Sequence, residues 1–588
     1  MGKQSDNLET EVDLPPITSG TAEATEASAA AETPTADQPD GADAVDQPVE
    51  PARRPGWVRR IFGWGLTGVA GAFVLLALNV PNTLVGLRTT TFARFPIEVV
   101  VVGGLLILLR GRARRWTATV AGLLLGVMVL VKCLDMGFRY VLVRPWDPIF
   151  DWVLLRDGLG YLNGIYGKKA AVGAIVGVIV LILVLLAVST LSVRRLSRTL
   201  VTGHETSGTR IVAVLTVVWV VCAAFGQTIH GLPRATDITS ATAWATSKGV
   251  PGTLLDQGKF NKALATDAFG NTPGDQLLPG LKGKDVVFTF VESYGQTAAE
   301  DPRVSALLNA GTQTLESEGF STRSAWMTSP TAGGGSFLAH STLYSGLWIN
   351  NAARYRTLVK SDRLTLPRAF GKANWRTVGE MPGLTGKWPE GGFFGYDKIY
   401  SAYSNGFGGP RYNWASTPDQ YILSNLQRNE LTKPGHTPVM AQVETTSSHI
   451  PWTYVPTLVD WDKVGNGRAT AGAPPDVRKH DDAWTRSQYY LTIEYALNTL
   501  ISYVQKYGND NLVLVFLGDH QPIPTVAGQH ATRNVPITIV AKDKNVINQI
   551  SGWNWTDGLK PGANAPTWRM DSFRDRFLTA FGSTPHTN

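Results

Sequence analysis

Long apolar segments occupy the first part of the chain, and short apolar runs separated by polar stretches occupy the rest. A helix needs about 20 mostly apolar residues to cross a bilayer, and the first, third and fourth of five segments approach that length. The second and fifth are shorter, and a buried helix of a soluble protein is the alternative for them. The segments are Ile61–Val80, Phe95–Leu109, Trp116–Met136, Ala170–Ser189 and Ile211–Phe225. We therefore expect a membrane domain of about five transmembrane helices over residues 56–228.

Arginines cluster at alternate ends of these segments. They precede the first segment, follow the second at residues 110–115, and lie between the fourth and fifth at residues 194–210. Because positively charged loops stay on the cytoplasmic side of a membrane, we expect these three regions to be cytoplasmic. An odd number of spans then places the chain after about residue 228 outside the cell. Most of the net charge of +7 therefore reflects topology and does not indicate a nucleic acid partner.

Two polar stretches flank the predicted membrane domain. Residues 1–55 are rich in Ala, Thr, Pro, Glu and Asp and nearly free of large apolar residues, a composition that cannot offset the entropy of ordering. We expect a disordered cytoplasmic tail there. Residues 229–280 are polar and rich in Gly and Thr, and we expect a linker that lies along the membrane.

The remaining residues, 281–588, alternate short β-branched runs with helical patterns, which is typical of an α/β domain with a mainly parallel sheet. Apolar residues recur at helical spacing over Trp484–Tyr507, and this pattern predicts a helix. The predicted strands are Asp285–Val291, Trp375–Glu380, Val439–Val443, Leu512–Phe516 and Pro536–Ala541.

The chemistry of the chain has to use oxygen and nitrogen ligands. Its two cysteines, Cys133 and Cys222, lie inside apolar segments, which leaves neither a disulfide framework nor a cysteine metal site. Three glycines directly precede Ser336, which opens a helical pattern. A helix N-terminus after a glycine loop offers free N–H groups to an anion such as phosphate or sulfate. The alternative for Ser336 is a plain helix N-cap after a turn.

Acidic residues follow two of the predicted strands. Glu292 comes directly after Val291, and Asp519 and His520 come after the strand that begins at Leu512. Taken separately, Glu292 is also explained by a salt bridge and Asp519-His520 by a surface turn. Because ligand sites of such sheets collect at the carboxyl ends of strands, these groups and a hydroxyl could together bind a divalent metal.

These motifs resemble those of the alkaline phosphatase superfamily, specifically the membrane branch that includes lipoteichoic acid synthase and the phosphoethanolamine transferases. The resemblance covers residues 60–580 and implies an alkaline phosphatase-like, sulfatase-like extracytoplasmic domain over residues 281–588. It implies that Glu292, Asp519, His520 and the hydroxyl of Ser336 hold one divalent metal ion. It also implies that Ser336 is the nucleophile that forms a covalent phospho-enzyme, with Thr331 as the reserve candidate.

The same resemblance implies residues that bind the substrate. His449 resembles a histidine that contacts the phosphoryl group and protonates the leaving group, and Trp388 resembles a tryptophan of the substrate site. The glycerol-phosphate transferases have an arginine two residues after that tryptophan, where this chain has Glu390. Lys387 could supply the missing positive charge. His340 lies one helical turn after Ser336 and could face the site, and a structural role is its alternative.

The resemblance implies a bacterial membrane transferase that moves a phospho-alcohol head group, glycerol phosphate above all, from a phospholipid to an envelope glycan or lipid. Mn²⁺ is the expected metal, and Mg²⁺ and Zn²⁺ fit the same ligand types. A sulfatase or phosphodiesterase of the same superfamily is one alternative. Sulfatases need a Cys/Ser-x-Pro-x-Arg context, whereas Ser336 is followed by Phe-Leu-Ala-His. A non-enzymatic envelope scaffold is another alternative, but all four predicted metal ligands are present.

Overall fold

The computed structural model describes residues 57–200, 205–225, 234–386, 388–412, 417–476, 478 and 480–583. The predicted tail over residues 1–55 and the candidate residue Lys387 lie outside the described residues. Residues 1–60 and 61–588 form two separate units, and the fold and the site belong to the second.

Among the described residues, three helices are long and apolar enough to cross a membrane. They are Ile61–Asn79 within α1 (Trp57–Asn79), α4 (Gly111–Val141) and Gly167–Thr199 within α5 (Trp152–Thr199). The second and fifth predicted segments correspond to shorter apolar helices, α3 (Ile97–Leu108) and the part of α6 (Glu205–Phe225) from Thr209 onwards. Helix formation is thus seen in all five segments, and the crossing of α3 and α6 stays a prediction.

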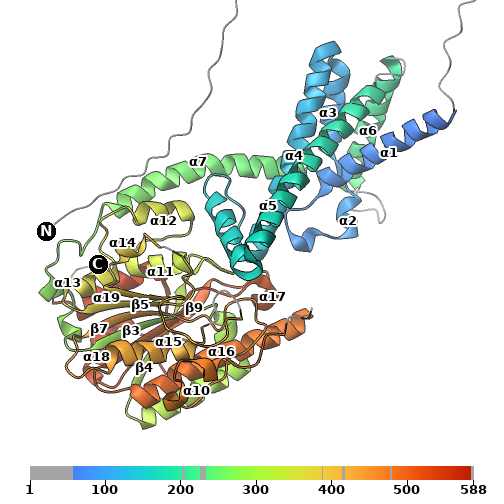
Figure 1. Cartoon of the computed structure of the whole chain (residues 1–588). Coiled ribbons are helices and arrows are strands. Elements are labelled where there is room, and N and C mark those ends of the chain that lie inside the picture. The colour runs from blue at the N-terminus through green and yellow to red at the C-terminus, as the bar shows by residue number, and fades with distance from the viewer. Residues whose placement is uncertain are drawn as a thin grey trace, which may run out of the picture. The chain divides into compact units, whose positions relative to one another are not determined.

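Helices α4 and α5 pack closely against each other (Figure 1). Glycine makes this approach possible, because a Cβ atom on Gly122 would lie 2.5 Å from the Cα atom of Thr190. Helix α5 changes direction at Gly167, whose φ of 79° is not helical. The short helices η1 (Leu84–Gly86) and α2 (Thr89–Phe92) follow α1, and β1 (Phe95–Pro96) pairs in parallel with β2 (Ala235–Thr236).

The expected linker contains one long helix, α7 (Ile238–Leu264). Its last turns bring Phe260 into the core of the following domain, where it joins Phe269, Leu277 and Leu281. The first turn of α7 is held as well, because the hydroxyl of Thr239 donates to the carbonyl oxygen of Leu78 at 2.8 Å. The apolar residues of α7 are too widely spaced in a polar stretch for their pattern to predict this helix. The domain boundary at residue 280 stays a prediction.

A nine-stranded mixed sheet forms the centre of the domain. The strand order is β10-β4-β9-β8-β3-β7-β5-β6, with β11 beside β4. Strands β8, β3, β7, β5 and β6 are parallel, whereas β9 runs antiparallel to both β8 and β4. The expected mainly parallel sheet therefore describes one half of the sheet. The strands are β3 (Asp285–Val291), β4 (Ser321–Thr328), β5 (Arg376–Met381), β6 (Lys398–Ser401), β7 (Val439–Glu444), β8 (Leu512–Gly518), β9 (Asn534–Ala541), β10 (Thr556–Asp557) and β11 (Thr567–Arg569).

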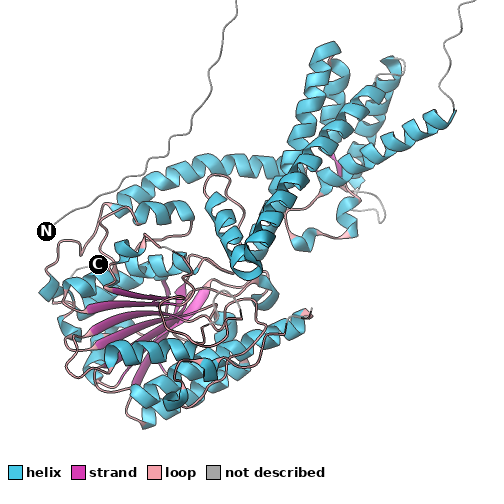
Figure 2. Ribbon diagram, in the orientation of Figure 1, coloured by secondary structure: helices cyan, strands magenta, loops and turns pink. Residues whose placement is uncertain are grey.

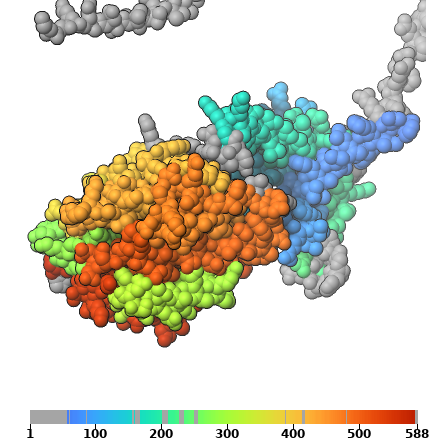
Figure 3. Space-filling view, turned by 60° about the horizontal axis from the view of Figure 1, so that its bottom comes forward, coloured from blue at the N-terminus to red at the C-terminus, as the bar shows by residue number. Residues whose placement is uncertain are grey.

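Helices cover both faces of the sheet (Figure 2). The central strands are apolar on both sides because both of their faces are buried. Helices α10 and α16 lie side by side on one face and are seen in yellow-green and orange in Figure 3. The helices of the domain are α8 (Gly274–Leu277), α9 (Gln296–Ala299), α10 (Pro302–Ser317), α11 (Ser336–Ser345), α12 (Ala352–Leu358), α13 (Leu366–Lys372), α14 (Gly391–Phe394), α15 (Asp419–Leu426), α16 (Asp482–Tyr507), α17 (Pro524–Ala527), α18 (Lys544–Gln549) and α19 (Phe573–Phe581).

Candidate active site

Ser336 is the first residue of α11, as its sequence context predicts. The three preceding glycines, Gly333, Gly334 and Gly335, have φ values of 72°, 156° and 81°, a region that other residues rarely adopt. A Cβ atom on Gly333 would lie 1.7 Å from the carbonyl oxygen of Val141, which only glycine can approach so closely. The loop thus presents the hydroxyl of Ser336 beside the free N–H groups of a helix N-terminus.

The parallel pairing of β3 with β8 brings the two acidic motifs together. Val291 pairs with Gly518 at the ends of these strands, so that Glu292 and Asp519 follow at the same edge of the sheet. Ligand atoms of Glu292, Asp519 and His520 all lie within 4.8 Å of one another, and the three side chains are buried. His520 Nε2 is 3.4 Å from Asp519 Oδ2 and 3.7 Å from Glu292 Oε1.

The hydroxyl of Ser336 belongs to the same cluster. It donates a hydrogen bond to Glu292 Oε2 at 3.1 Å, and its oxygen lies 3.2 Å from His520 Nε2. The structure therefore brings together all four groups that the sequence resemblance implies as metal ligands.

Backbone groups hold these side chains in place. Asp519 Oδ1 accepts hydrogen bonds from the N–H groups of Ser293 and His520, at 2.8 and 2.7 Å. The hydroxyl of Ser293 donates to Glu292 Oε1 at 2.7 Å, and Ser293 has a φ of 57°. Sequence reasoning missed this supporting role of Ser293, because a left-handed serine after a strand has no distinctive pattern.

The charges of the cluster shift one another's pKa values. Burial raises the pKa of Glu292, but the positive charges of His449 and His520 outweigh burial and leave that pKa lowered. Burial and the charge of Glu292 raise the pKa of Asp519. Burial lowers the pKa of His520, but Asp519 and Glu292 outweigh burial and leave that pKa raised. Two adjacent buried carboxylates thus favour a positive charge between them.

A divalent cation fits this donor set. Two carboxylates, one imidazole and one hydroxyl are the oxygen and nitrogen ligands that Mn²⁺, Mg²⁺ and Zn²⁺ accept. A cation would also neutralise the two carboxylates, which are otherwise costly to bury.

Thr331, the reserve nucleophile, lies in the glycine loop and is buried. Its hydroxyl donates a hydrogen bond to the carbonyl oxygen of Gly334 at 2.5 Å, which ties the loop together. This contact gives Thr331 a structural use in the loop, whereas the contacts of Ser336 join it to the acidic cluster.

A cavity of about 210 Å³ is lined by residues of α11 and by two of the predicted substrate-binding residues, His340 and Trp388. His340 Nδ1 is 3.1 Å from Glu444 Oε1, and its Nε2 atom is buried with no hydrogen-bond partner among the described residues. The indole N–H of Trp388 donates to the hydroxyl of Tyr355 at 3.3 Å. Sequence reasoning missed Glu444 and Tyr355. Glu444 ends strand β7, and Glu292 directly follows strand β3, so the same strand-end pattern could have marked Glu444.

His449 is half-buried, and its Nδ1 atom is 2.5 Å from the carbonyl oxygen of Ile450. Its contact with a phosphoryl group stays a prediction.

Comparisons with known proteins find similar folds only among solved structures. No protein-family model matches the chain, and no curated protein does. A lipoteichoic acid synthase, LtaP from Listeria monocytogenes, is 15% identical over 55% of this chain and 78% of its own, with a TM-score of 0.35. Lipooligosaccharide phosphoethanolamine transferase A from Neisseria meningitidis is 14% identical over 87% of this chain and 95% of its own, with a TM-score of 0.45. An alkaline phosphatase superfamily protein from Vibrio parahaemolyticus is 17% identical over 55% and 74%, with a TM-score of 0.36. The solved structures that the chain resembles thus include the alkaline phosphatase superfamily and its membrane branch, which is the resemblance that its motifs predict.

Proposed function

We propose that the protein is a metal-dependent transferase that moves a phospho-alcohol head group from a membrane phospholipid, through Ser336, to an envelope glycan or lipid. The observation that carries this proposal is the position of Ser336 Oγ, 3.1 Å from Glu292 Oε2 and 3.2 Å from His520 Nε2. Glycerol phosphate is the head group, and phosphatidylglycerol the donor, that the sequence resemblance implies above all. Mn²⁺ is the cation that we expect.

Each half of the reaction exchanges one phosphorus–oxygen bond for another. In the first half, Ser336 Oγ attacks the phosphorus atom of the lipid, and the bond from phosphorus to the diacylglycerol oxygen breaks. Diacylglycerol leaves with a proton. The sequence resemblance implies that His449 donates this proton. In the second half, an acceptor hydroxyl attacks phosphorus, its proton is released, and Ser336 recovers its hydroxyl as the phosphoserine bond breaks.

The residues of the site prepare Ser336 for this attack. Glu292 Oε2 accepts the hydroxyl hydrogen and so directs the lone pairs of Ser336 away from the carboxylate. The N-terminus of α11 offers N–H groups to the phosphate oxygens. A divalent cation, when bound by Glu292, Asp519 and His520, would supply positive charge that favours the ionised hydroxyl and neutralises the phosphate.

The test is diacylglycerol release from labelled phosphatidylglycerol and phosphatidylethanolamine by the purified full-length protein with Mn²⁺. We expect Ser336→Ala to lower release by a thousandfold or more, on the order of what loss of a nucleophile costs other enzymes. Thr331→Ala is the comparison variant, and its hydroxyl contact with Gly334 predicts a smaller loss.

Other outcomes would point elsewhere. Release that survives in Ser336→Ala and is lost in Thr331→Ala would move the nucleophile to Thr331. Cleavage of an aryl sulfate without cleavage of either lipid would favour a sulfatase. Release of the free head group in the presence of acceptors would favour a phosphodiesterase.

A further inference from the structure

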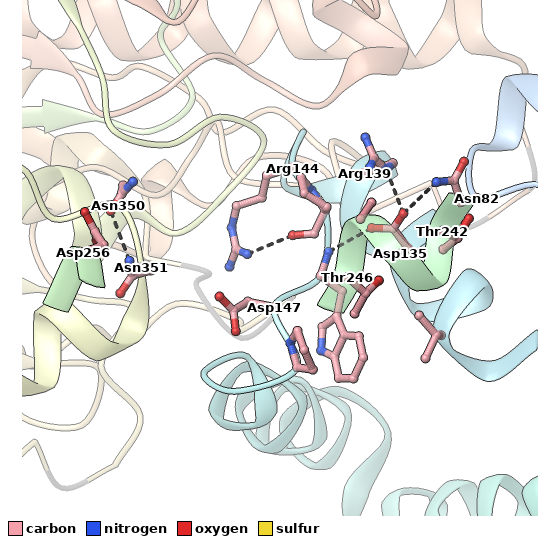
Figure 4. A pocket seen from close by; sticks show the side chains of 15 residues that line it. Asn82, Asp135, Arg139, Arg144, Asp147, Thr242, Thr246, Asp256, Asn350 and Asn351 are labelled. Atoms are coloured by element: carbon pink, nitrogen blue, oxygen red, sulfur yellow. Dashed lines mark hydrogen bonds and ion pairs between the residues drawn. The ribbon is translucent and has the colours of Figure 1, made fainter. Parts of the chain in front are cut away.

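A second, larger cavity of about 460 Å³ lies at the end of α4, outside the site described above (Figure 4). Its walls come from α4, from the loop between α4 and α5, from α7 and from the segment before α12. Figure 4 shows Asn350 and Asp256 on one side and Asp135 and Thr242 on the other. Its volume is within the range of about 300–1,000 Å³ that is typical of ligand sites.

The charged side chains that line this cavity have partners in the protein, and Asp147 Oδ1 accepts hydrogen bonds from the backbone N–H groups of Ile149 and Phe150. Arg144 donates two hydrogen bonds to Asp151, at 2.7 and 2.6 Å, and Arg139 donates one to Asp135 at 2.9 Å. Both carboxylate oxygens of Asp256 accept from Arg354. An anionic ligand would have to compete with the carboxylates that are paired with Arg139 and Arg144, and a cation with the arginines that are paired with Asp135 and Asp256. The cavity therefore favours a neutral ligand.

Neutral hydrogen-bonding groups make up much of the remaining lining. They are the amides of Asn82, Asn350 and Asn351 and the hydroxyls of Thr242 and Thr246. Trp146 adds an aromatic surface, and its indole N–H is buried with no hydrogen-bond partner in the part of the chain that the structure describes. Only 9% of Trp146 is exposed, so a donor without a partner is costly here, and a ligand hydroxyl that reached it would remove that cost. A ligand rich in hydroxyl groups can both donate to and accept from such a lining.

The loop that lines the cavity also contacts the glycine loop of the active site. The carbonyl oxygen of Val141 lies against Gly333, and a Cβ atom on Gly334 would lie 3.3 Å from the side chain of Leu142. Arg144 and Trp146, a few residues further on, line the cavity. The stretch from Val141 to Trp146 thus contacts both the cavity and the glycine loop that precedes Ser336.

We propose that this cavity binds a neutral sugar of the acceptor, whose hydroxyl attacks the phosphoserine. The proposal rests on the proposed function. The acceptor oxygen forms a bond to phosphorus, the bond from phosphorus to Ser336 Oγ breaks, and the proton of the acceptor hydroxyl balances the one that Ser336 regains. The cavity then decides between acceptors, while the acidic cluster performs the transfer.

The test measures two products of the full-length protein in lipid nanodiscs that contain the donor lipid. Diacylglycerol reports donor cleavage, and the phosphodiester formed with methyl α-D-mannopyranoside or methyl β-D-glucopyranoside reports transfer. We expect at least one glycoside to accept the head group much better than n-propanol. Trp146→Phe and Thr246→Val should each lower the ratio of glycoside phosphodiester to diacylglycerol by about fivefold, the usual effect of one lost hydrogen bond.

Trp244→Phe is the matched control, because Trp244 lies on α7 beside Thr246 but is 62% exposed and does not line the cavity. This variant should leave the ratio unchanged. Equal ratios in all variants, or equal transfer to n-propanol and the glycosides, would overturn the acceptor site while leaving the proposed function intact. Absence of diacylglycerol release from any lipid would instead remove the proposed function, and this acceptor site with it.

Discussion

At the scale of single residues, Glu292 and Asp519 place two carboxylates side by side in a buried site. Removal of the cation with a chelator should therefore lower the melting temperature of the protein. Binding at about 100 times Kd adds about 2.7 kcal/mol, and each kcal/mol shifts Tm by about 2–4 °C in a domain of this kind, so we expect a loss of roughly 5 °C or more. Thermal unfolding of the solubilised chain with Mn²⁺ or with EDTA measures this difference.

Asp519→Asn is the diagnostic variant for the same experiment. It removes one of the two buried charges, so the chelated variant should be more stable than the chelated unmodified protein and should respond little to Mn²⁺. Asp462→Asn, at an exposed position, should respond as the unmodified protein does. If Asp519→Asn responds to Mn²⁺ as strongly as the unmodified protein, the cation binds elsewhere.

The residues of the candidate site differ in how far the sequence predicts them. Glu292, Asp519 and His520 follow apolar runs, and Ser336 follows three glycines, so local patterns mark each of them. Parallel pairing then brings their ends together. The contact of His340 with Glu444 joins α11 to β7, and no local pattern marks such a contact. The place of Trp146 in a cavity depends on helices that are far apart in the sequence.

At the scale of elements, the loop from Gly333 to Gly335 connects the nucleophile with the end of α4. Gly333→Ala would place a methyl group against the carbonyl oxygen of Val141 and would strain a φ of 72°. A left-handed conformation costs a non-glycine residue about 1–2 kcal/mol, so the loop should shift. We expect at least tenfold slower diacylglycerol release with a Tm that falls by only a few degrees.

Gly392→Ala is the control for this loop, because a Cβ atom there has no neighbour within 4 Å and the residue lies in helix α14. It should release diacylglycerol at the normal rate. Normal release by Gly333→Ala would show that the position of Ser336 does not depend on the contact with Val141.

The sequence patterns predict some helices and strands closely and miss others. Strand β3 runs from Asp285 to Val291 as predicted, and α16 begins two residues before its prediction. Strand β4 was missed, because Ser, Thr and Arg interrupt its apolar positions. The direction of β9 was missed for another reason: an apolar run indicates a buried strand but not the direction in which it pairs.

At the scale of the whole molecule, contacts among the helix ends bear on the number of membrane crossings. Asn82, after α1, donates a hydrogen bond to Asp135 near the end of α4. Phe95, before α3, pairs with Ala235, after α6. Val141, at the end of α4, lies against Gly333 of the domain that carries the site. We predict from these contacts that the segments all lie on one side of the membrane, the side of the domain.

From that arrangement we predict that α3 and α6 cross the membrane as well. The arginines at residues 110–115 and 194–198 lie at the ends of α4 and α5 that are away from the segments named above. The chain therefore has to pass between the side of these arginines and the side of those segments. Helix α3 has 12 residues, about 18 Å of helix, so the bilayer has to thin or the flanking residues have to extend to reach the interfaces. Length alone counts three spans among the described residues, whereas the contacts and the charges support the predicted five.

Labelling of single cysteines in intact cells distinguishes these topologies. In a background with Cys133→Ala and Cys222→Ala, a membrane-impermeant maleimide should label Arg88→Cys and Lys433→Cys from outside, because both positions are exposed and lie on the side of the domain. Arg112→Cys, between α3 and α4, should be labelled only after the membrane is permeabilised. Labelling of Arg112→Cys in intact cells would mean that α3 does not cross the membrane. The contact of Asn82 with Asp135 and that of Val141 with Gly333 could then not both form in the membrane.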